Sequence, residues 1–198
     1  YQVYDVTNLL HEGENALGAM LGDGWAAGFV GLGNRQLYTD KPKLLAQLEV
    51  TLSDGSTVTI MSDKTWKHQF GPILESDMFM GEAYDARLEL TNWNTANYDD
   101  KAWLKVEQAE APKAALVATN GPTVKRIEEI KPVSDPVDKS DFIRRKAIFD
   151  MGQNMVGWVR LKGNAPAGTS VVLRFAEVLN PDGSLYTTIL RDARATRV

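Results

Sequence analysis

Cysteine is absent from the 198 residues of this chain, which excludes disulfide bonds and thiolate metal sites. Histidine is scarce: only His11 and His68 are present, far apart and without a partner at a metal-ligand spacing. A Cys–His nucleophile is therefore impossible, and no Gly-x-Ser-x-Gly elbow occurs. These absences exclude two classes of enzyme: cysteine hydrolases, and serine hydrolases whose nucleophile lies in a Gly-x-Ser-x-Gly elbow.

Long apolar runs and blocks of basic residues are missing as well. No apolar stretch approaches the roughly 18 to 20 residues of a bilayer-spanning helix. The net charge is −4 and the Lys and Arg residues are scattered, which argues against a nucleic-acid footprint. We therefore expect neither a membrane nor a nucleic acid as a partner. The lack of cysteine leaves the location open, because exported proteins can lack it too.

Short alternating runs between turn signals predict antiparallel β-structure. Hydrophobic residues at 43% and charged residues at 24% are ordinary values for a folded domain. Helical character is scarce: residues 39–48 have some, although Lys41-Pro42 favours an extended entry, and residues 109–118 could hold one short turn. Ser53-Asp54-Gly55-Ser56 is a turn between two such runs and predicts a hairpin. The alternating runs lie at residues 44–52, 57–62, 158–161 and 171–178.

The predicted fold class is all-β, in two parts. Residues 1–118 form an antiparallel β-sandwich of jelly-roll or galactose-binding-like type, and residues 119–198 form a linker and the start of a second, partial β-sandwich domain. The chain opens at Tyr1 within a strand-like pattern and without Met, which is typical of a piece of a longer protein. We therefore expect exposed sheet edges that neighbouring parts of the parent would cover.

Two stretches carry a family resemblance. FDMGQNMVGWVRLKG at residues 149–163, followed by AGT and then by AEVLNPDGSLYT, resembles the accessory β-domain of bacterial α-L-rhamnosidases, inverting glycoside hydrolases of family 78. The pattern GP…GE-YDAR at residues 71–87 is typical of the N-terminal domain of the same family. The resemblance implies that the parent enzyme hydrolyses terminal α-L-rhamnose from glycosides such as plant flavonoids and polysaccharides. It also implies that the catalytic carboxylates lie on a separate helical barrel, so we expect no catalytic residue here.

A cluster of acidic residues at positions 71–89 admits two interpretations. Two carboxylates on facing strands, roughly 5 to 10 Å apart, could form a glycosidase acid–base pair. The favoured alternative is an ion-pair network in which Arg87 pairs with Asp85 or Glu82. The cluster consists of Glu75, Asp77, Glu82 and Asp85, with Tyr84 and Arg87 beside them.

The glycine-rich loop, residues 22–42, is the predicted sugar-binding site. Trp25, Phe29 and Tyr38 offer aromatic faces on which the CH groups of a pyranose could stack. The alternative is that Trp25 and Tyr38 plug the end of the sandwich and the glycines only permit tight turns. The family usually has a second aromatic residue where this chain has Ala26, which removes one stacking surface. The residues expected to hydrogen-bond sugar hydroxyls are Asp23, Asn34, Arg35 and Asp40.

A calcium site is predicted at Glu14 and Asn15, and no cofactor is expected to be required. Rhamnose-binding modules related to this domain use calcium beside an Asp–Asn pair, and Glu14-Asn15 is the closest match here. The alternative is that Asn15 caps a β-turn through its side chain. The sequence leaves both interpretations open.

Together these patterns predict a non-catalytic, substrate-recognition portion of an α-L-rhamnosidase. Its partners would be rhamnose-containing glycosides and the remaining domains of the parent enzyme. Two alternatives stay open: a purely structural spacer that supports the catalytic barrel, or a sugar-binding module of another glycosidase. The location stays open between the bacterial cytoplasm and the periplasm or exterior.

Overall fold

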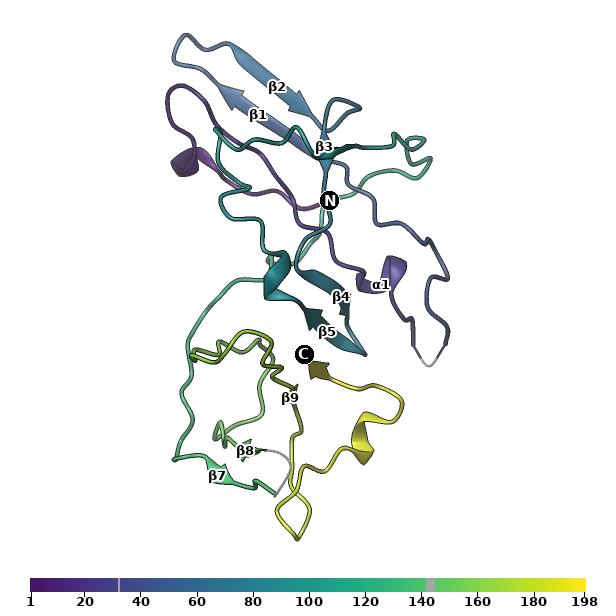
Figure 1. The fold of residues 1–198 in the computed structure, drawn as a ribbon. Coiled ribbons are helices and arrows are strands. Elements are labelled where there is room, and N and C mark those ends of the chain that lie inside the picture. Colours follow the sequence, from purple (N-terminus) through teal and green to yellow (C-terminus); the bar gives the residue numbers. More distant parts are fainter. Residues whose placement is uncertain (32, 142–144) are drawn as a thin grey trace. The chain divides into compact units, whose positions relative to one another are not determined.

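The computed structural model describes residues 1–31, 33–141 and 145–198, and strands outnumber helices throughout this part (Figure 1). The strands are β1 (Gln47–Thr51), β2 (Thr57–Met61), β3 (Lys67–His68), β4 (Ile73–Asp77), β5 (Gly81–Tyr84), β6 (Leu104–Lys105), β7 (Val137–Asp138), β8 (Ala147–Ile148), β9 (Leu173–Arg174) and β10 (Thr196–Arg197). The helical turns are η1 (Thr7–Leu9), α1 (Gly24–Ala27), η2 (Ala86–Leu88) and η3 (Thr188–Leu190). Among these residues no helix has the length and apolar character needed to cross a membrane.

The prediction of an all-β, antiparallel fold is confirmed. Strands β1 and β2, β3 and β6, β4 and β5, and β7 and β8 all pair antiparallel. The pairing of β10 with β5 is parallel. Helix is limited to single turns in the described ranges, as the absence of helical periodicity in the sequence indicates.

The β1–β2 hairpin forms where the sequence predicts it. Gln47 pairs with Met61 at one end and Thr51 with Thr57 at the other. In the turn, the Asp54 carboxylate accepts from the backbone N–H of Ser56 at 2.9 Å, an Asx-turn that reverses the chain locally. This prediction is confirmed. The sequence could predict the hairpin because every signal involved lies within about six residues of the turn.

The chain divides into two compact units, each described here by itself. The smaller unit comprises Tyr1–Tyr4 and Leu116–Thr169, and the larger comprises Asp5–Ala115 and Ser170–Val198. In the smaller unit the amino terminus of Tyr1 donates to the Val117 carbonyl at 2.6 Å, and β7 pairs with β8. The domain boundary expected at residue 118 stays a prediction.

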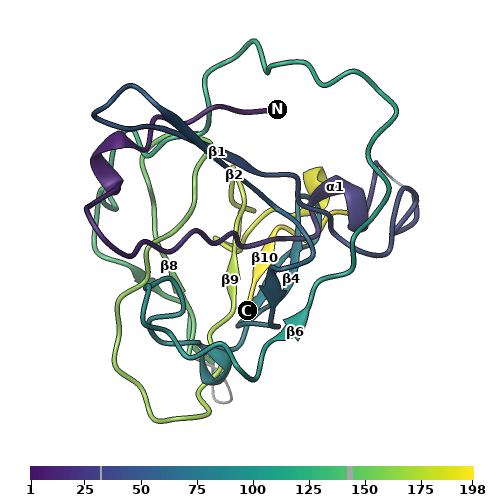
Figure 2. The same cartoon turned by 90° about the horizontal axis from the view of Figure 1, so that it is seen from above.

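The larger unit contains a mixed sheet with the order β4-β5-β10-β9. Strands β9 and β10, from residues 170–198, lie side by side in Figure 2, where Thr196 pairs with Arg174. Thr196 also pairs with Gly81 of β5, so the last residues of the chain extend a sheet begun by residues 73–84. The glycine-rich loop reaches this sheet through α1, which contacts β4 and lies beside it in Figure 1.

Burial is greatest at this contact between α1 and β4. Ala27 of α1 is 1% exposed, and the carboxylate-bearing Asp77 at the end of β4 is 8% exposed. Gly28, which follows α1, is buried with them. The most enclosed part of the described chain is therefore the base of the glycine-rich loop.

Candidate functional site

Asp23 joins the start of the glycine-rich loop to β4 and to the far side of the loop. It precedes α1, but its side chain makes no capping hydrogen bond to that helix. Instead, one carboxylate oxygen accepts from the Ser76 backbone N–H at 3.1 Å, and the other lies 3.2 Å from Arg35 Nη2. Charge-assisted bonds of this kind are the stronger ones in proteins, so Asp23 holds three segments together.

The loop has a defined backbone on both sides of its tip. Phe29 and Arg35 form an antiparallel bridge, and the Arg35 Nε donates to the Ala27 carbonyl at 3.3 Å. The Gln36 N–H donates to the Gly28 carbonyl at 3.1 Å, and the Thr39 N–H donates to the Ala26 carbonyl at 3.2 Å. Residue 32 lies outside the described residues. The loop is therefore a folded hairpin with a helical turn at its base.

Asp77 anchors the loop from the end of β4. Its Oδ2 accepts from the Phe29 N–H at 2.5 Å, and its Oδ1 accepts from the N–H groups of Phe79 and Met80 at 2.7 and 2.8 Å. Burial raises the pKa of the Asp77 carboxyl, but the three N–H donors and the nearby Arg35 charge together outweigh it, so the pKa is lowered overall. The group is thus a buried, ionised carboxylate whose oxygens are satisfied by backbone donors.

Gly28 is required where the loop meets β4. A Cβ at this position would overlap Asp77 Oδ2 and the Gly24 carbonyl oxygen. The absence of a side chain therefore lets the loop backbone approach the carboxylate. This gives one loop glycine a structural role that the sequence alone does not distinguish from the roles of its neighbours.

An aromatic pair lies above this anchor. The Trp25 ring is parallel to the Phe79 ring within 2°, with 6.5 Å between their centroids, and Trp25 stays 52% exposed. The Phe79 carbonyl accepts from the N–H groups of Arg194 and Ala195 at 2.9 and 3.1 Å. From the sequence, Phe79 is expected only to help pack the sandwich, because no local signal links it to a tryptophan more than fifty positions earlier.

The structure brings together only part of the predicted sugar-binding set. Asp23, Trp25 and Arg35 lie on the anchored base of the loop. Tyr38 is 74% exposed, and Asn34 and Asp40 are also exposed. Sugar binding by any of these residues stays a prediction.

Asn15 has turn-forming contacts at the predicted calcium site. Its Nδ2 donates to the carbonyls of His11 and Gly13 at 2.8 and 3.1 Å, and its Oδ1 accepts from the His11 N–H at 3.1 Å. Glu14 is exposed beside it. Calcium takes about six to eight oxygen ligands, and within the described ranges no group of three or more acidic or histidine residues could hold a metal. Calcium binding at Glu14 and Asn15 therefore stays a prediction.

Two carboxylates of the acidic cluster, those of Asp85 and Glu82, form ion pairs. Arg87 Nη2 lies 2.6 Å from Asp85 Oδ2, and its Nε donates to Oδ1 at 2.8 Å. The Arg87 side chain, followed by its backbone N–H, lowers the pKa of Asp85 to about 2. Glu82 pairs with Arg197 at 2.8 Å across β5 and β10. These contacts correspond to the ion-pair interpretation for Asp85 and Arg87.

Tyr84 provides a titration test of this network. Its hydroxyl donates to Glu89 Oε1 at 2.6 Å, and this bond, together with burial and the Glu89 charge, raises the pKa of Tyr84 to about 12. Because the fold favours the neutral phenol, its stabilising contribution is complete below about pH 10 and is lost as the pH rises toward 12. We expect the 295 nm titration to contain a late component that disappears in Tyr84→Phe. Glu89→Gln should move this component toward pH 10, and an unchanged curve in both variants would contradict the network.

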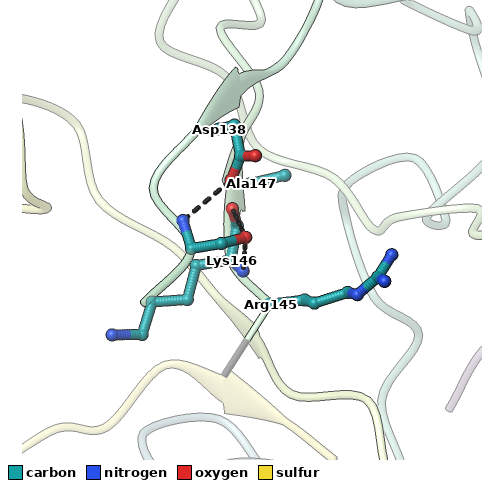
Figure 3. A pocket seen from close by; sticks show the side chains of 5 residues that line it. Asp138, Arg145, Lys146 and Ala147 are labelled. Carbon is teal, nitrogen blue, oxygen red and sulfur yellow. Dashed lines mark hydrogen bonds between the residues drawn. The ribbon is translucent and has the colours of Figure 1, made fainter. Parts of the chain in front are cut away.

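A shallow hollow of about 280 Å³ lies in the smaller unit, at the β7–β8 hairpin (Figure 3). The Ser140 N–H donates to Asp138 Oδ1 at 2.8 Å, and its hydroxyl accepts from the Lys146 N–H at 3.1 Å. Residues 142–144 of this hairpin lie outside the described residues. The hydrogen bonds drawn in Figure 3 join residues of the hairpin to one another.

Family models match almost the whole chain. The model described as the α-L-rhamnosidase N-terminal domain matches residues 1–128, and the bacterial α-L-rhamnosidase concanavalin-like domain matches residues 142–198. A curated α-L-rhamnosidase of Streptomyces avermitilis is 44% identical over 198 residues, which cover 99% of this chain and 19% of that protein. The chain therefore spans about a fifth of the length of this relative.

Solved structures give the same result for the fold. The crystal structure of Streptomyces avermitilis α-L-rhamnosidase complexed with L-rhamnose matches with a TM-score of 0.76 at 44% identity, covering 88% of this chain and 17% of that one. The α-L-rhamnosidase of Aspergillus terreus matches with a TM-score of 0.79 at 37% identity, covering 89% and 20%. Sequence and fold thus agree on one family.

Proposed function

We propose a sugar-recognition role for this chain, which belongs to the α-L-rhamnosidase family. In this proposal it is a non-catalytic, accessory portion of an enzyme that hydrolyses terminal α-L-rhamnose from glycosides. The carboxylates Glu82 and Asp85 support the non-catalytic part, because each is held by an arginine. The other domains of the enzyme and rhamnose-containing glycosides are its proposed partners.

One observation carries the proposal: a half-exposed tryptophan ring sits on a loop that is fixed at its base. A pyranose presents CH groups on one face, and an aromatic ring offers a large, rigid surface for them. Trp25 is 52% exposed, so a sugar can reach the ring, and its parallel partner Phe79 limits how the ring can turn. Binding to a fixed surface loses little conformational entropy, which favours even a small ligand.

We assign polar recognition to the guanidinium of Arg35, which contacts the residues two positions before and two positions after Trp25. Its Nε and Nη2 contact the Ala27 carbonyl and Asp23, which orients the planar group. A guanidinium has five N–H donors, and the Arg35 side chain is 40% exposed, so donors remain for a sugar hydroxyl. L-Rhamnose is the ligand to test first, because a related enzyme has been crystallised with it.

Titration with L-rhamnose tests the recognition role. We expect a saturable change in tryptophan fluorescence, and calorimetry should show that Trp25→Ala lowers the affinity at least about tenfold, or about 1.4 kcal/mol. Trp158→Ala is the matched control, because it removes an equally exposed tryptophan (59%) from the smaller unit and should leave the affinity unchanged.

Failure to bind L-rhamnose at millimolar concentration by either method would overturn the role. If deletion of the chain then inactivates the whole enzyme, the structural-spacer alternative replaces it. The chain alone should also release no aglycone from an aryl rhamnoside. Release that Glu82→Gln or Asp85→Asn abolishes would contradict the non-catalytic assignment.

A further inference from the structure

Asp77 is the charged side chain that the described chain buries most deeply, at 8% exposure. Burial of a carboxylate is costly unless its oxygens are hydrogen-bonded. Here the hydrogen bonds come from three backbone N–H groups. A carboxylate buried this deeply cannot contact a ligand. It can affect ligand binding only through the segments that its hydrogen bonds hold in place.

Those segments are the two that carry the aromatic pair. Oδ2 binds Phe29, two residues after the helical turn that bears Trp25, and Oδ1 binds Phe79 itself. The carbonyl of Phe79 is held from the opposite side by Arg194 and Ala195. Both the N–H and the carbonyl of Phe79 are therefore held by hydrogen bonds. Because Asp77 also binds Phe29, it sets the position of the Trp25 segment relative to Phe79.

We propose that Asp77 is a positioning residue that fixes the geometry of the Trp25–Phe79 pair, so that the ring surface offered to a sugar depends on a carboxylate that never touches the sugar. This inference rests on the proposed recognition function. It adds Phe79 to the sugar-binding surface and explains why the loop approaches β4 through Gly28, where a side chain would collide with the carboxylate.

Asp77→Asn in the 198-residue chain tests the inference. An amide keeps one acceptor oxygen and places an NH2 donor at the other position. In either orientation one set of N–H groups, Phe29 on one side or Phe79 and Met80 on the other, faces a donor instead of an acceptor. We expect the L-rhamnose affinity to fall at least about tenfold while the circular dichroism spectrum keeps its β-character.

A spectroscopic readout separates positioning from a general loss of stability. The Trp25 emission, obtained as the difference between spectra with and without Trp25→Phe, should move to longer wavelength in Asp77→Asn. The matched control is Asp54→Asn, which alters an exposed carboxylate that accepts a similar backbone bond in the β1–β2 turn. This control should change neither the Trp25 emission nor the affinity.

Two results would overturn the inference: wild-type affinity in Asp77→Asn, or an unchanged Trp25 emission. If the wild-type chain itself does not bind L-rhamnose, the recognition function fails, and the emission still decides whether Asp77 positions Trp25. If Asp77→Asn does not fold, NMR of the wild-type chain decides. The amide protons of Phe29 and Phe79 and the Trp25 ring should then share one transition at acid pH, and separate transitions would contradict the inference.

Discussion

Gly81→Ala is expected to lower the free energy of unfolding by roughly 2 to 5 kcal/mol, the largest effect of any glycine substitution considered. Gly81 has φ +95°, where a Cβ is strained, and that Cβ would overlap the carbonyl oxygen of Thr196 in β10. The partner is backbone, so no side-chain rotation relieves the overlap. Strand β5 or β10 must move, and the pairing of Gly81 with Thr196 is lost. Urea unfolding followed by circular dichroism measures the change.

Gly55→Ala separates the two causes of that loss, which are backbone strain at positive φ and overlap with a neighbouring strand. Gly55 has a similar φ of +84°, but no atom lies within 4 Å of a Cβ built there. Gly55→Ala should therefore lower the free energy of unfolding only by the conformational strain, roughly 1 to 2 kcal/mol. Equal losses in the two variants would show that the contact between β5 and β10 contributes nothing to stability.

Gly28→Ala is expected to release the glycine-rich loop from β4. The added Cβ would overlap Asp77 Oδ2 and the Gly24 carbonyl oxygen, so the Phe29–Asp77 hydrogen bond must lengthen or break. Leaving a buried carboxylate oxygen without its donor costs roughly 1 to 3 kcal/mol of stability. Because Trp25 lies on the same loop, the affinity for L-rhamnose should fall at least about tenfold in calorimetry.

Gly71→Ala is the matched control for that prediction. It lies just before β4, and no atom lies within 4 Å of its Cβ position. In open space an added methyl group changes stability by less than about 1 kcal/mol. A Gly28→Ala variant that behaves like Gly71→Ala in both unfolding and binding would contradict the tight contact between loop and carboxylate.

The sheet under the loop draws on both family domains. Strands β4 and β5 come from the stretch that matches the N-terminal domain model, while β9 and β10 come from the stretch that matches the concanavalin-like domain model. Arg194 and Ala195, just before β10, also hold the backbone of Phe79. The proposed sugar-binding surface therefore depends on residues more than a hundred positions away in the sequence.

Local patterns of the sequence determined much of this protein. The β1–β2 hairpin was predictable because its turn and its alternation lie within fifteen residues. The pairing of Arg87 with Asp85 and the turn closed by Asn15 are likewise contacts between near neighbours. Family membership was readable from ordered motifs, and with it the expectation of an accessory domain without a catalytic pair.

Only the tertiary structure decided which residues meet at the loop. Asp77 belonged to an acidic cluster in the sequence, yet its carboxylate binds Phe29, 48 positions earlier, and not a neighbouring arginine. Phe79 stacks with Trp25, and Thr196 pairs with Gly81, and both contacts join residues more than fifty positions apart. No turn signal or periodicity encodes such contacts, because backbone donors and aromatic rings are present throughout the chain. Strand pairing and burial select among them, and those are properties of the folded molecule.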